Sequence, residues 1–338
     1  MIILHKDNTI YQVSNDYMER FVGTDRDNKY KLTHIGGFYY KKFEHLFQSL
    51  NLDYKLTYYE DYPDVDGEYF FGRFAHAPID KEQHEKYYYE LEKRFDNIWP
   101  DKLNYNLYDD KVKQYQFLES LGYSDRVEYQ CVNTLEELYH SVDVGKVVKS
   151  TYGAGSGNVF LITEKKYCEH DGLIDLIKQT EVGDIKEFFP AIVQPMWKGK
   201  WYKLHITNEY AYCKLYDYEH DFSHPLNFGI GNPKHEWTVR MNWMWSNNYV
   251  MSKDELEKIP LFFELLDIKK KLNTPNIVFD VIEDKILEFS SIYTEPIPLR
   301  DVYGRYDINL NMFEEIQENM EEISYYQTKS ILKGFNLL

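Results

Sequence analysis

The sequence has little cysteine, an excess of negative over positive charge, and no long hydrophobic run. Its 338 residues include only Cys131, Cys168 and Cys213, and these have no CxxC spacing. A disulfide framework or a cysteine-based metal site is therefore not expected, and the thiols are predicted to be reduced. No segment approaches the ~20 consecutive apolar residues that a membrane-spanning helix needs.

The shortage of positive charge narrows the class of partners. Lys and Arg number 39 against 56 Asp and Glu, so the net charge is -17. A surface of that sign repels phosphate backbones, and nucleic acid is not an expected partner. The apolar start, residues 1–4, is too short for the core of a signal peptide. We expect a cytoplasmic protein that neither binds nor crosses a membrane.

Hydrophobic residues make up 43% of the chain, which is enough for sizeable cores in two or three domains. In the first hundred residues, strand-like alternation and helical spacing follow each other along the chain. Such an order favours a parallel sheet of the α/β type. The predicted strands are residues 1–4, 53–59 and 69–75, and the predicted helices are residues 41–50 and 84–95.

The rest of the chain, after a break at Trp99-Pro100-Asp101, mixes helices with strands that pair locally. Gly122 is expected to end the first of these helices. The predicted helices are residues 109–121, 135–140, 171–180, 254–272 and most of 313–332. Three single strands are predicted at residues 144–149, 159–163 and 191–195. Residues 201–206 and 209–216 are a predicted antiparallel pair with its turn at Thr207-Asn208, and residues 277–282 and 285–289 are a predicted hairpin. Residues 224–233 are a predicted loop.

A glycine-rich loop lies between two of the predicted strands. Gly153, Gly155 and Gly157 follow the strand that ends in Lys149, and a strand rather than a helix comes next. This order excludes a Walker phosphate loop and a dinucleotide fingerprint, since both need a helix after the glycines. Free backbone N–H groups and the Lys149 ammonium could still hold phosphate oxygens. A tight hairpin whose glycines serve only the turn is the alternative.

Two carboxylates are predicted to face each other across the second hairpin. Asp280 and Glu288 lie on its two strands and are flanked by apolar residues, so both strands are expected to be buried. Neighbouring buried carboxylates repel unless a cation lies between them. Magnesium, which accepts one or two carboxylates together with phosphate oxygens, suits this pair. The alternative is that one carboxylate points to solvent at a sheet edge.

The order of these features resembles the ATP-grasp superfamily of carboxylate–amine ligases. The helix start Asp110-Lys111 is followed by VVKSTYGAGSGNVFLIT, AIVQPMWKGKWYKLHIT and FDVIEDKILEFSS. The resemblance covers roughly residues 100–300. It implies an α/β plus α+β chain, in which an N-terminal pre-ATP-grasp α/β domain (1–100) precedes a small lobe with the glycine loop (101–192) and a large lobe with the carboxylates (193–338).

The resemblance also implies the roles of individual residues. Asp280, Glu288 and Ser290 would hold Mg²⁺, and Lys203 and Arg240 would act at the reacting centre. Two positions depart from the family pattern: Ser290 stands where an asparagine is usual, and Ser150 stands after the strand lysine where proline is usual. The implied ATP-binding residues are Lys111, Lys149, Gly153, Gly155, Ser156, Gly157, Gln194, Pro195, Met196 and Trp197.

The reaction implied by the resemblance is the activation of a carboxylate by ATP as an acyl phosphate, which an amine or similar nucleophile then attacks. The expected partners are a small-molecule or peptide carboxylate and an amine acceptor, and a homodimer is one possible assembly. A kinase of the same fold that phosphorylates a hydroxyl stays open. So does a nucleotide-binding module without catalysis, which the serine at position 290 would suit.

Overall fold

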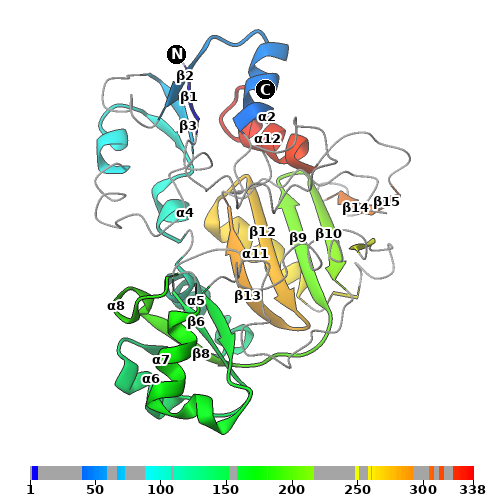
Figure 1. Cartoon of the computed structure of the whole chain (residues 1–338). Helices are drawn as coiled ribbons and strands as arrows, with labels where there is room; N and C mark the ends of the chain where they lie inside the picture. The colour runs from blue at the N-terminus through cyan, green and yellow to red at the C-terminus, as the bar shows by residue number, and fades with distance from the viewer. Residues whose placement is uncertain are drawn as a thin grey trace, which may run out of the picture.

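Figure 1 shows the computed structural model of the chain. It describes residues 2–6, 40–58, 67–72, 88–107, 110–151, 158–180, 182–216, 248–250, 258–259, 261–291, 304–307, 312–315 and 323–338. Within these residues, the strands form three sheets that follow one another along the chain. No helix in this part of the chain is long and apolar enough to span a bilayer.

The N-terminal sheet is parallel, as the sequence predicted, with the strand order β2-β1-β3-β4. Helix α2 (Tyr40–Ser49) packs Phe43 and Phe47 against it in a core that also holds Trp99. Of the predicted helix 84–95, residues 88–92 are helical, residues 93–95 are not, and residues 84–87 lie outside the described part. The strands are β1 (Ile2–Lys6), β2 (Tyr54–Tyr58), β3 (Tyr69–Phe71) and β4 (Asn97–Trp99).

The second sheet is antiparallel, with the order β5-β8-β6-β7. One face carries Val148, Phe160 and Val193, which pack against the helices α6 (Leu135–Ser141), α7 (His170–Lys178) and α8 (Ile185–Phe188). Because side chains alternate along a strand, Lys149 lies on the face away from these helices. The strands are β5 (Gln130–Val132), β6 (Lys146–Ser150), β7 (Val159–Leu161) and β8 (Ala191–Pro195), and a short helix η4 (Lys165–Cys168) precedes α7.

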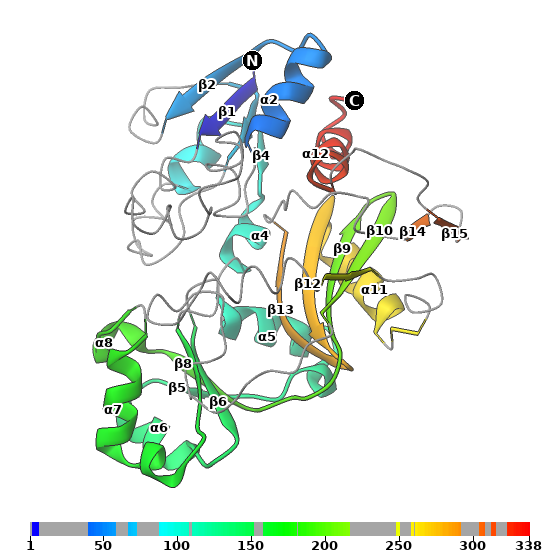
Figure 2. The ribbon, with the colours of Figure 1, turned by 45° about the vertical axis from the view of Figure 1, so that its right-hand side comes forward.

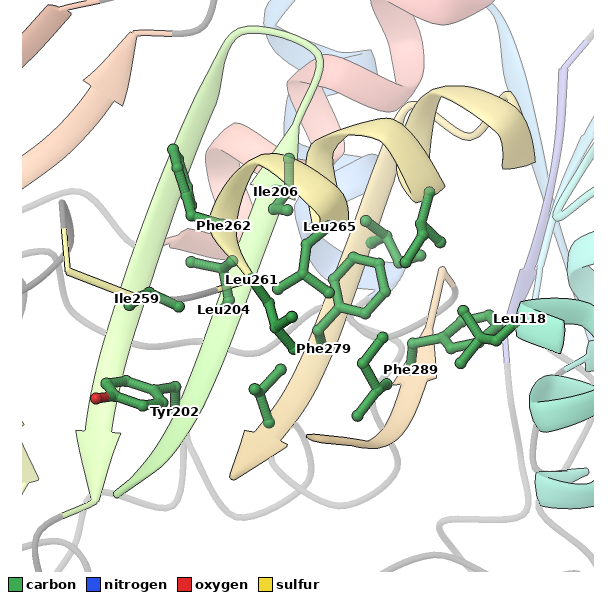
Figure 3. Close-up of a cluster of buried hydrophobic side chains, with 14 of the residues drawn as sticks. Leu118, Tyr202, Leu204, Ile206, Ile259, Leu261, Phe262, Leu265, Phe279 and Phe289 are labelled. Atoms are coloured by element: carbon green, nitrogen blue, oxygen red, sulfur yellow. The ribbon is translucent and has the colours of Figure 1, made fainter. Parts of the chain in front are cut away.

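The third and largest sheet has the order β13-β12-β9-β10-β14-β15, with β11 also paired to β10. Helix α11 (Phe262–Leu272) covers one face, where Leu204, Ile206 and Phe279 pack against Leu265 (Figure 3). The predicted strand pair and hairpin are confirmed, and the first turn lies at Asn208-Glu209, one residue later than predicted. The strands are β9 (Trp201–Thr207), β10 (Tyr210–Tyr216), β11 (Asn248–Val250), β12 (Asn276–Ile282), β13 (Lys285–Ser290), β14 (Gly304–Asp307) and β15 (Met312–Glu315).

Helix α12 (Ile323–Gly334) connects the last sheet to the first (Figure 2). Its Ile331 and Leu332 are fully buried in the core of the N-terminal sheet, and its Gln327 Nε2 lies 3.1 Å from His205 Nδ1 on β9. Between the sheets run the helices α4 (Lys102–Leu107), α5 (Lys111–Ser120) and η3 (Ser124–Arg126). Gly122, with φ of +89°, follows α5, as the sequence predicted.

Two predicted helices are wrong in extent. The helix predicted over 254–272 begins only at Phe262: residues 258, 259 and 261 are not helical, and residues 254–257 lie outside the described part. A proline disfavours helical backbone at the residue before it, and Pro260 follows Ile259. The helix predicted over 313–332 is wrong at its start, because residues 313–315 belong to strand β15, which pairs with β14. Residues 316–322 lie outside the described part, and residues 323–332 belong to α12.

Candidate active site

Three lysines and two carboxylates from five different elements meet between the second and third sheets. Lys111 Nζ on α5 lies 3.9 Å from Glu288 Oε2 on β13, and Lys203 Nζ on β9 lies 3.7 Å from Asp280 Oδ2 on β12. Lys149 on β6 interacts electrostatically with Glu288, Lys111 and Asp280. The sequence separations are large, so this cluster exists only because the sheets and α5 pack together.

Strand pairing sets the positions of the two carboxylates. Asp280 is directly opposite Glu288 on one side and Lys203 on the other, so the three side chains are neighbours across β13, β12 and β9. The predicted facing of the two carboxylates is therefore confirmed. The pairing shifts register between Asp280 and Val281, one residue beyond the carboxylate.

The two carboxylates differ in burial. The Asp280 side chain is 11% exposed, whereas the Glu288 side chain is 42% exposed. The expectation that both strands are buried is thus wrong for β13, in which Ile286 and Phe289 are buried and the other four residues are half-buried. The reason is its place at the end of the sheet order, where among the described strands only β12 pairs with it. Glu288 therefore remains accessible to a ligand.

The start of α5 is fixed beside the end of β6. The Asp110 side chain caps the helix by accepting a hydrogen bond from Lys113 N at 3.0 Å, which satisfies one of the free N–H groups of the first turn. The backbone N–H of Lys111 donates to Thr151 O at 3.1 Å. These two contacts hold Lys111 close to Lys149, although the two residues are far apart in the sequence.

The next turn of α5 attaches to the strand that carries Glu288. Phe289 N donates to Gln114 Oε1 at 3.1 Å, and Tyr115 OH donates to Leu287 O at 2.7 Å. Tyr115 OH also lies 3.3 Å from Gln194 Oε1 on β8. Helix α5 thereby joins the third sheet to the second on both sides of Glu288. Nothing in the sequence near Gln114 and Tyr115 indicated this role.

Lys149 is a buried cation in a mixed environment. It is 9% exposed, and its pKa is lowered to about 8, chiefly because burial disfavours the charged form and also because Lys111 is near. The carboxylates Glu288 and Asp280 act in the opposite direction and favour the ammonium form. An anionic group that entered beside Lys149 would favour the charged form further.

An apolar cluster lies on the same face of the second sheet as Lys149. Met196 packs there against Val147, Val159 and Leu161. Lys149 shares this face with Val147 because side chains alternate along β6. The site therefore offers a positive charge next to an apolar wall.

The connection between the second and third sheets begins at the end of β8, beside the apolar cluster. Met196 N donates to Gly145 O at 3.1 Å, and Gln194 is buried. The indole N–H of Trp197 is buried without a partner among the described residues. Trp201, which the sequence did not single out, donates from Nε1 to Asp280 Oδ1 at 3.3 Å. Its position follows from the pairing of β9 with β12, which no local signal reveals.

The structure brings together only part of the predicted site. Lys111, Lys149, Lys203, Asp280 and Glu288 converge, and Gln194, Pro195, Met196 and Trp197 form the adjoining connection. Ser290 lies two residues beyond Glu288 on β13, opposite Val278. The remaining predicted residues, Gly153, Gly155, Ser156, Gly157 and Arg240, lie outside the described residues.

The carboxylate pair suits a metal that takes few protein ligands. The described residues contain no cluster of three or more His, Cys, Asp or Glu side chains around one point. Asp280 and Glu288 are two hard oxygen ligands on adjacent strands. Magnesium commonly binds one or two carboxylates and takes its other ligands from water and phosphate oxygens. The donor set therefore fits Mg²⁺ bound together with a phosphate-bearing ligand.

Comparison with known proteins places the fold. No protein-family model matches the sequence, and no curated protein matches it. Among solved structures, D-cycloserine synthetase DcsG aligns with a TM-score of 0.54 at 10% identity, over 100% of this chain and 99% of that one. A RiPP-associated ATP-grasp ligase from Chryseobacterium gregarium, in complex with ADP and a leader and core peptide, aligns with a TM-score of 0.52 at 13% identity, over 98% and 96%. At these identities the likeness establishes a shared fold.

Proposed function

We propose, on the premise that this chain has the ATP-grasp fold, that it is an ATP-dependent ligase that activates a carboxylate as an acyl phosphate. The observation that carries the proposal is the convergence of Lys111 and Lys149 with Asp280 and Glu288 between two sheets. In this proposal residues 101–192 form the small lobe and residues 193–338 the large lobe. Residues 1–100 are the preceding α/β domain.

ATP would lie between the second and third sheets. Lys111 and Lys149 would offset the charge of the phosphates, and the segment with Gly153, Gly155, Ser156 and Gly157 would cover them. The adenine would lie against Met196, which already contributes to an apolar cluster beside Lys149. Backbone groups at Gln194, Pro195 and Trp197 would bind its edge. Buried positive charge next to an apolar wall is the combination that a nucleotide needs.

Asp280, Glu288 and Ser290 would hold Mg²⁺. The ion supplies charge neutralisation at the phosphates when it is bound. Glu288 pairs with Lys111 and Asp280 with Lys203, so each carboxylate has a cationic neighbour. The serine at position 290 is a shorter ligand than the asparagine of the family pattern, and we expect it to contribute less than either carboxylate.

The chain's own residues would act by position and charge. A substrate carboxylate oxygen would attack the γ-phosphorus, the bond to the β-phosphate oxygen would break, and ADP would leave. The amine would then attack the acyl carbon and displace phosphate. Lys203 and Arg240 would stabilise the negative charge that develops at the reacting groups, and the glycine segment would exclude water. Phosphoryl transfer of this kind needs no covalent enzyme intermediate.

The proteins that share the fold support a proposal for the substrate class. One is described as a D-cycloserine synthetase, and another was solved with a leader and core peptide. We therefore propose a small-molecule or peptide carboxylate together with an amine acceptor.

The test is ATP turnover in the purified protein, measured as ADP release in the presence of panels of acids and amines. Lys149→Ala and Glu288→Ala should each abolish amine-dependent ADP release, because each removes a charge that only the nucleotide site uses. Lys146→Ala is the matched control: Lys146 lies on the same strand, and its side chain points to the face opposite Lys149. Unchanged turnover in Lys149→Ala or Glu288→Ala would refute the proposal.

A further inference from the structure

A cavity of about 1140 Å³ lies at the edge of the large sheet where β9 ends and β12 begins. One wall consists of β4 and α4 from the N-terminal part of the chain. The other consists of the C-terminal half of α11, the turn after β9 and the end of α12. Phe95, Trp99, Leu266 and Phe335 supply apolar surface among the lining residues.

Lys269 on α11 is the most unusual lining residue. It is only 8% exposed, and its Nζ donates to Asn208 Oδ1 at 2.6 Å. No carboxylate of the described residues lies within ion-pair distance of it, and burial alone lowers its pKa to about 8. Keeping an ammonium group out of water with only an amide oxygen as partner is costly. A neighbouring anion would remove that cost.

Most carboxylates around the cavity already have partners of their own. Glu92 pairs with Lys102 at 2.8 Å, and Asp267 pairs with Lys271 at 2.7 Å. Asp101 accepts hydrogen bonds from the backbone and side chain of Asn104. None of these three carboxylates balances Lys269.

Two more charged groups line the cavity, and both are exposed. These are Lys270, which adds a positive charge, and Asp96, which adds a negative one. Because both lie in solvent, they affect the buried ammonium of Lys269 only weakly. The interior of the cavity therefore keeps a positive charge that no described side chain neutralises.

Helix stabilisation does not account for the burial of Lys269. A lysine in the last turn of a helix interacts favourably with the helix dipole. Lys270 and Lys271 lie in the same last turn of α11 and provide that interaction from solvent-exposed positions. The dipole thus explains why lysines occur here, and it leaves unexplained why one of them lines a cavity.

The cavity is distinct from the candidate active site. Thr207, which lines the cavity, is four residues along β9 from Lys203, a separation of ~13 Å. Between these two positions, His205 is fully buried and contacts Gln327 of α12. A ligand in the cavity would instead touch α4, which leads into α5, the helix that carries Lys111.

We propose that this cavity binds a small organic anion, whose carboxylate or phosphate group pairs with Lys269 and whose apolar part lies against Phe95, Trp99 and Phe335. The anion would bridge the N-terminal sheet and α11. This site is separate from the nucleotide site, and its occupancy does not require ATP.

The test is calorimetric titration of the full-length protein with benzoate, phenyl phosphate and the neutral analogue benzamide at constant ionic strength. We expect saturable binding of benzoate or phenyl phosphate, with benzamide at least about tenfold weaker, because a charge-assisted hydrogen bond contributes about that factor. Which of the two anions binds more tightly distinguishes a carboxylate from a phosphate ligand. Lys269→Met should lower the anion affinity about tenfold, and Lys269→Arg should retain most of it.

Lys270→Met is the control, because Lys270 is exposed at the same helix end. Equal anion binding by Lys269→Met and the unaltered protein would overturn the proposal, as would the absence of anion binding to the unaltered protein. If Lys269→Met does not fold, acetylation of Lys269 in the unaltered protein serves instead. The anion that binds should protect Lys269, measured by mass spectrometry, and should leave Lys271 unprotected; equal acetylation of Lys269 with and without the anion would count against the site.

Discussion

Lys149 and Lys269 are both buried ammonium groups, and each has a pKa lowered to about 8, chiefly by burial. Their surroundings differ. Lys149 interacts with two carboxylates and a second lysine, whereas Lys269 has an amide oxygen. At Lys149, carboxylates lie beside the ammonium group. At Lys269, no described carboxylate lies within ion-pair distance.

The pH dependence of stability should reveal the burial of Lys269. Below about pH 8 its side chain is protonated in both the folded and the unfolded protein. Between about 8 and the unperturbed value of 10.5, the unfolded state binds more protons, so this residue makes the free energy of unfolding rise with pH. The rise should total about 3 kcal/mol, since each unit of pKa corresponds to about 1.4 kcal/mol.

Urea unfolding of Lys269→Met and of the unaltered protein at a series of pH values measures this rise in the free energy of unfolding. The free energy of unfolding of the unaltered protein should rise by this amount relative to that of Lys269→Met. Other groups with shifted pKa values, including Lys149, Tyr88 and Tyr115, are present in both proteins, so their contributions cancel. Lys270→Met should behave like the unaltered protein. Parallel pH curves for Lys269→Met and the unaltered protein would contradict the burial of a charged Lys269.

The sequence identified the charged residues of the candidate site better than their supports. Lys149, Asp280 and Glu288 could be found because charge beside glycines, or within an apolar hairpin, is a local signal. Tyr115 and Trp201 carry no such signal, because their hydrogen bonds join residues that are 172 and 79 positions apart. Only the packing of α5 on β13, and of β9 on β12, creates these contacts.

At the scale of the element, helix α5 is the piece that links the two halves of the site. Its N-cap, Asp110, is buried and accepts from Lys113 N. Asp110→Ala should lower the free energy of unfolding by about 1 kcal/mol, because one N–H of the first turn loses its acceptor. Asp110→Asn keeps an acceptor oxygen and should lose much less. Urea unfolding of the two variants measures the difference, and equal losses would show that the cap is unimportant.

The local sequence pattern is sufficient to predict some helices and strands but not others. The β12–β13 hairpin could be predicted because both strands and the turn are adjacent in sequence. The register shift between Asp280 and Val281, which brings Asp280 opposite Glu288, has no such local signal. The segment that forms β15 was predicted as helix, since short apolar runs do not distinguish the two states. Its partner β14 decides the outcome. Pro260 was a visible signal for the late start of α11.

At the scale of the whole molecule, α12 ties the end of the chain to its beginning. Leu332 is fully buried in a core with Ile2 and Phe43. Leu332→Ala should lower the free energy of unfolding by about 2–5 kcal/mol, because it leaves a cavity in that core. Leu338→Ala is the matched control, since Leu338 is exposed. Chemical unfolding measures both, and equal stability of the two variants would contradict the packing of α12.

Long-range organisation was the least predictable level. The sequence predicted the parallel N-terminal sheet from its alternation of strands and helices. It held no sign that the last helix completes that sheet's core, because α12 and α2 are separated by most of the chain.

The central claim is that ATP binds between the second and third sheets. A crystal structure with Mg²⁺ and a non-hydrolysable ATP analogue tests it most directly. We predict phosphates beside Lys111 and Lys149, adenine along Gln194 to Trp197, and the metal at Asp280 and Glu288. A nucleotide bound elsewhere, or an empty cleft at saturating analogue, would contradict the claim.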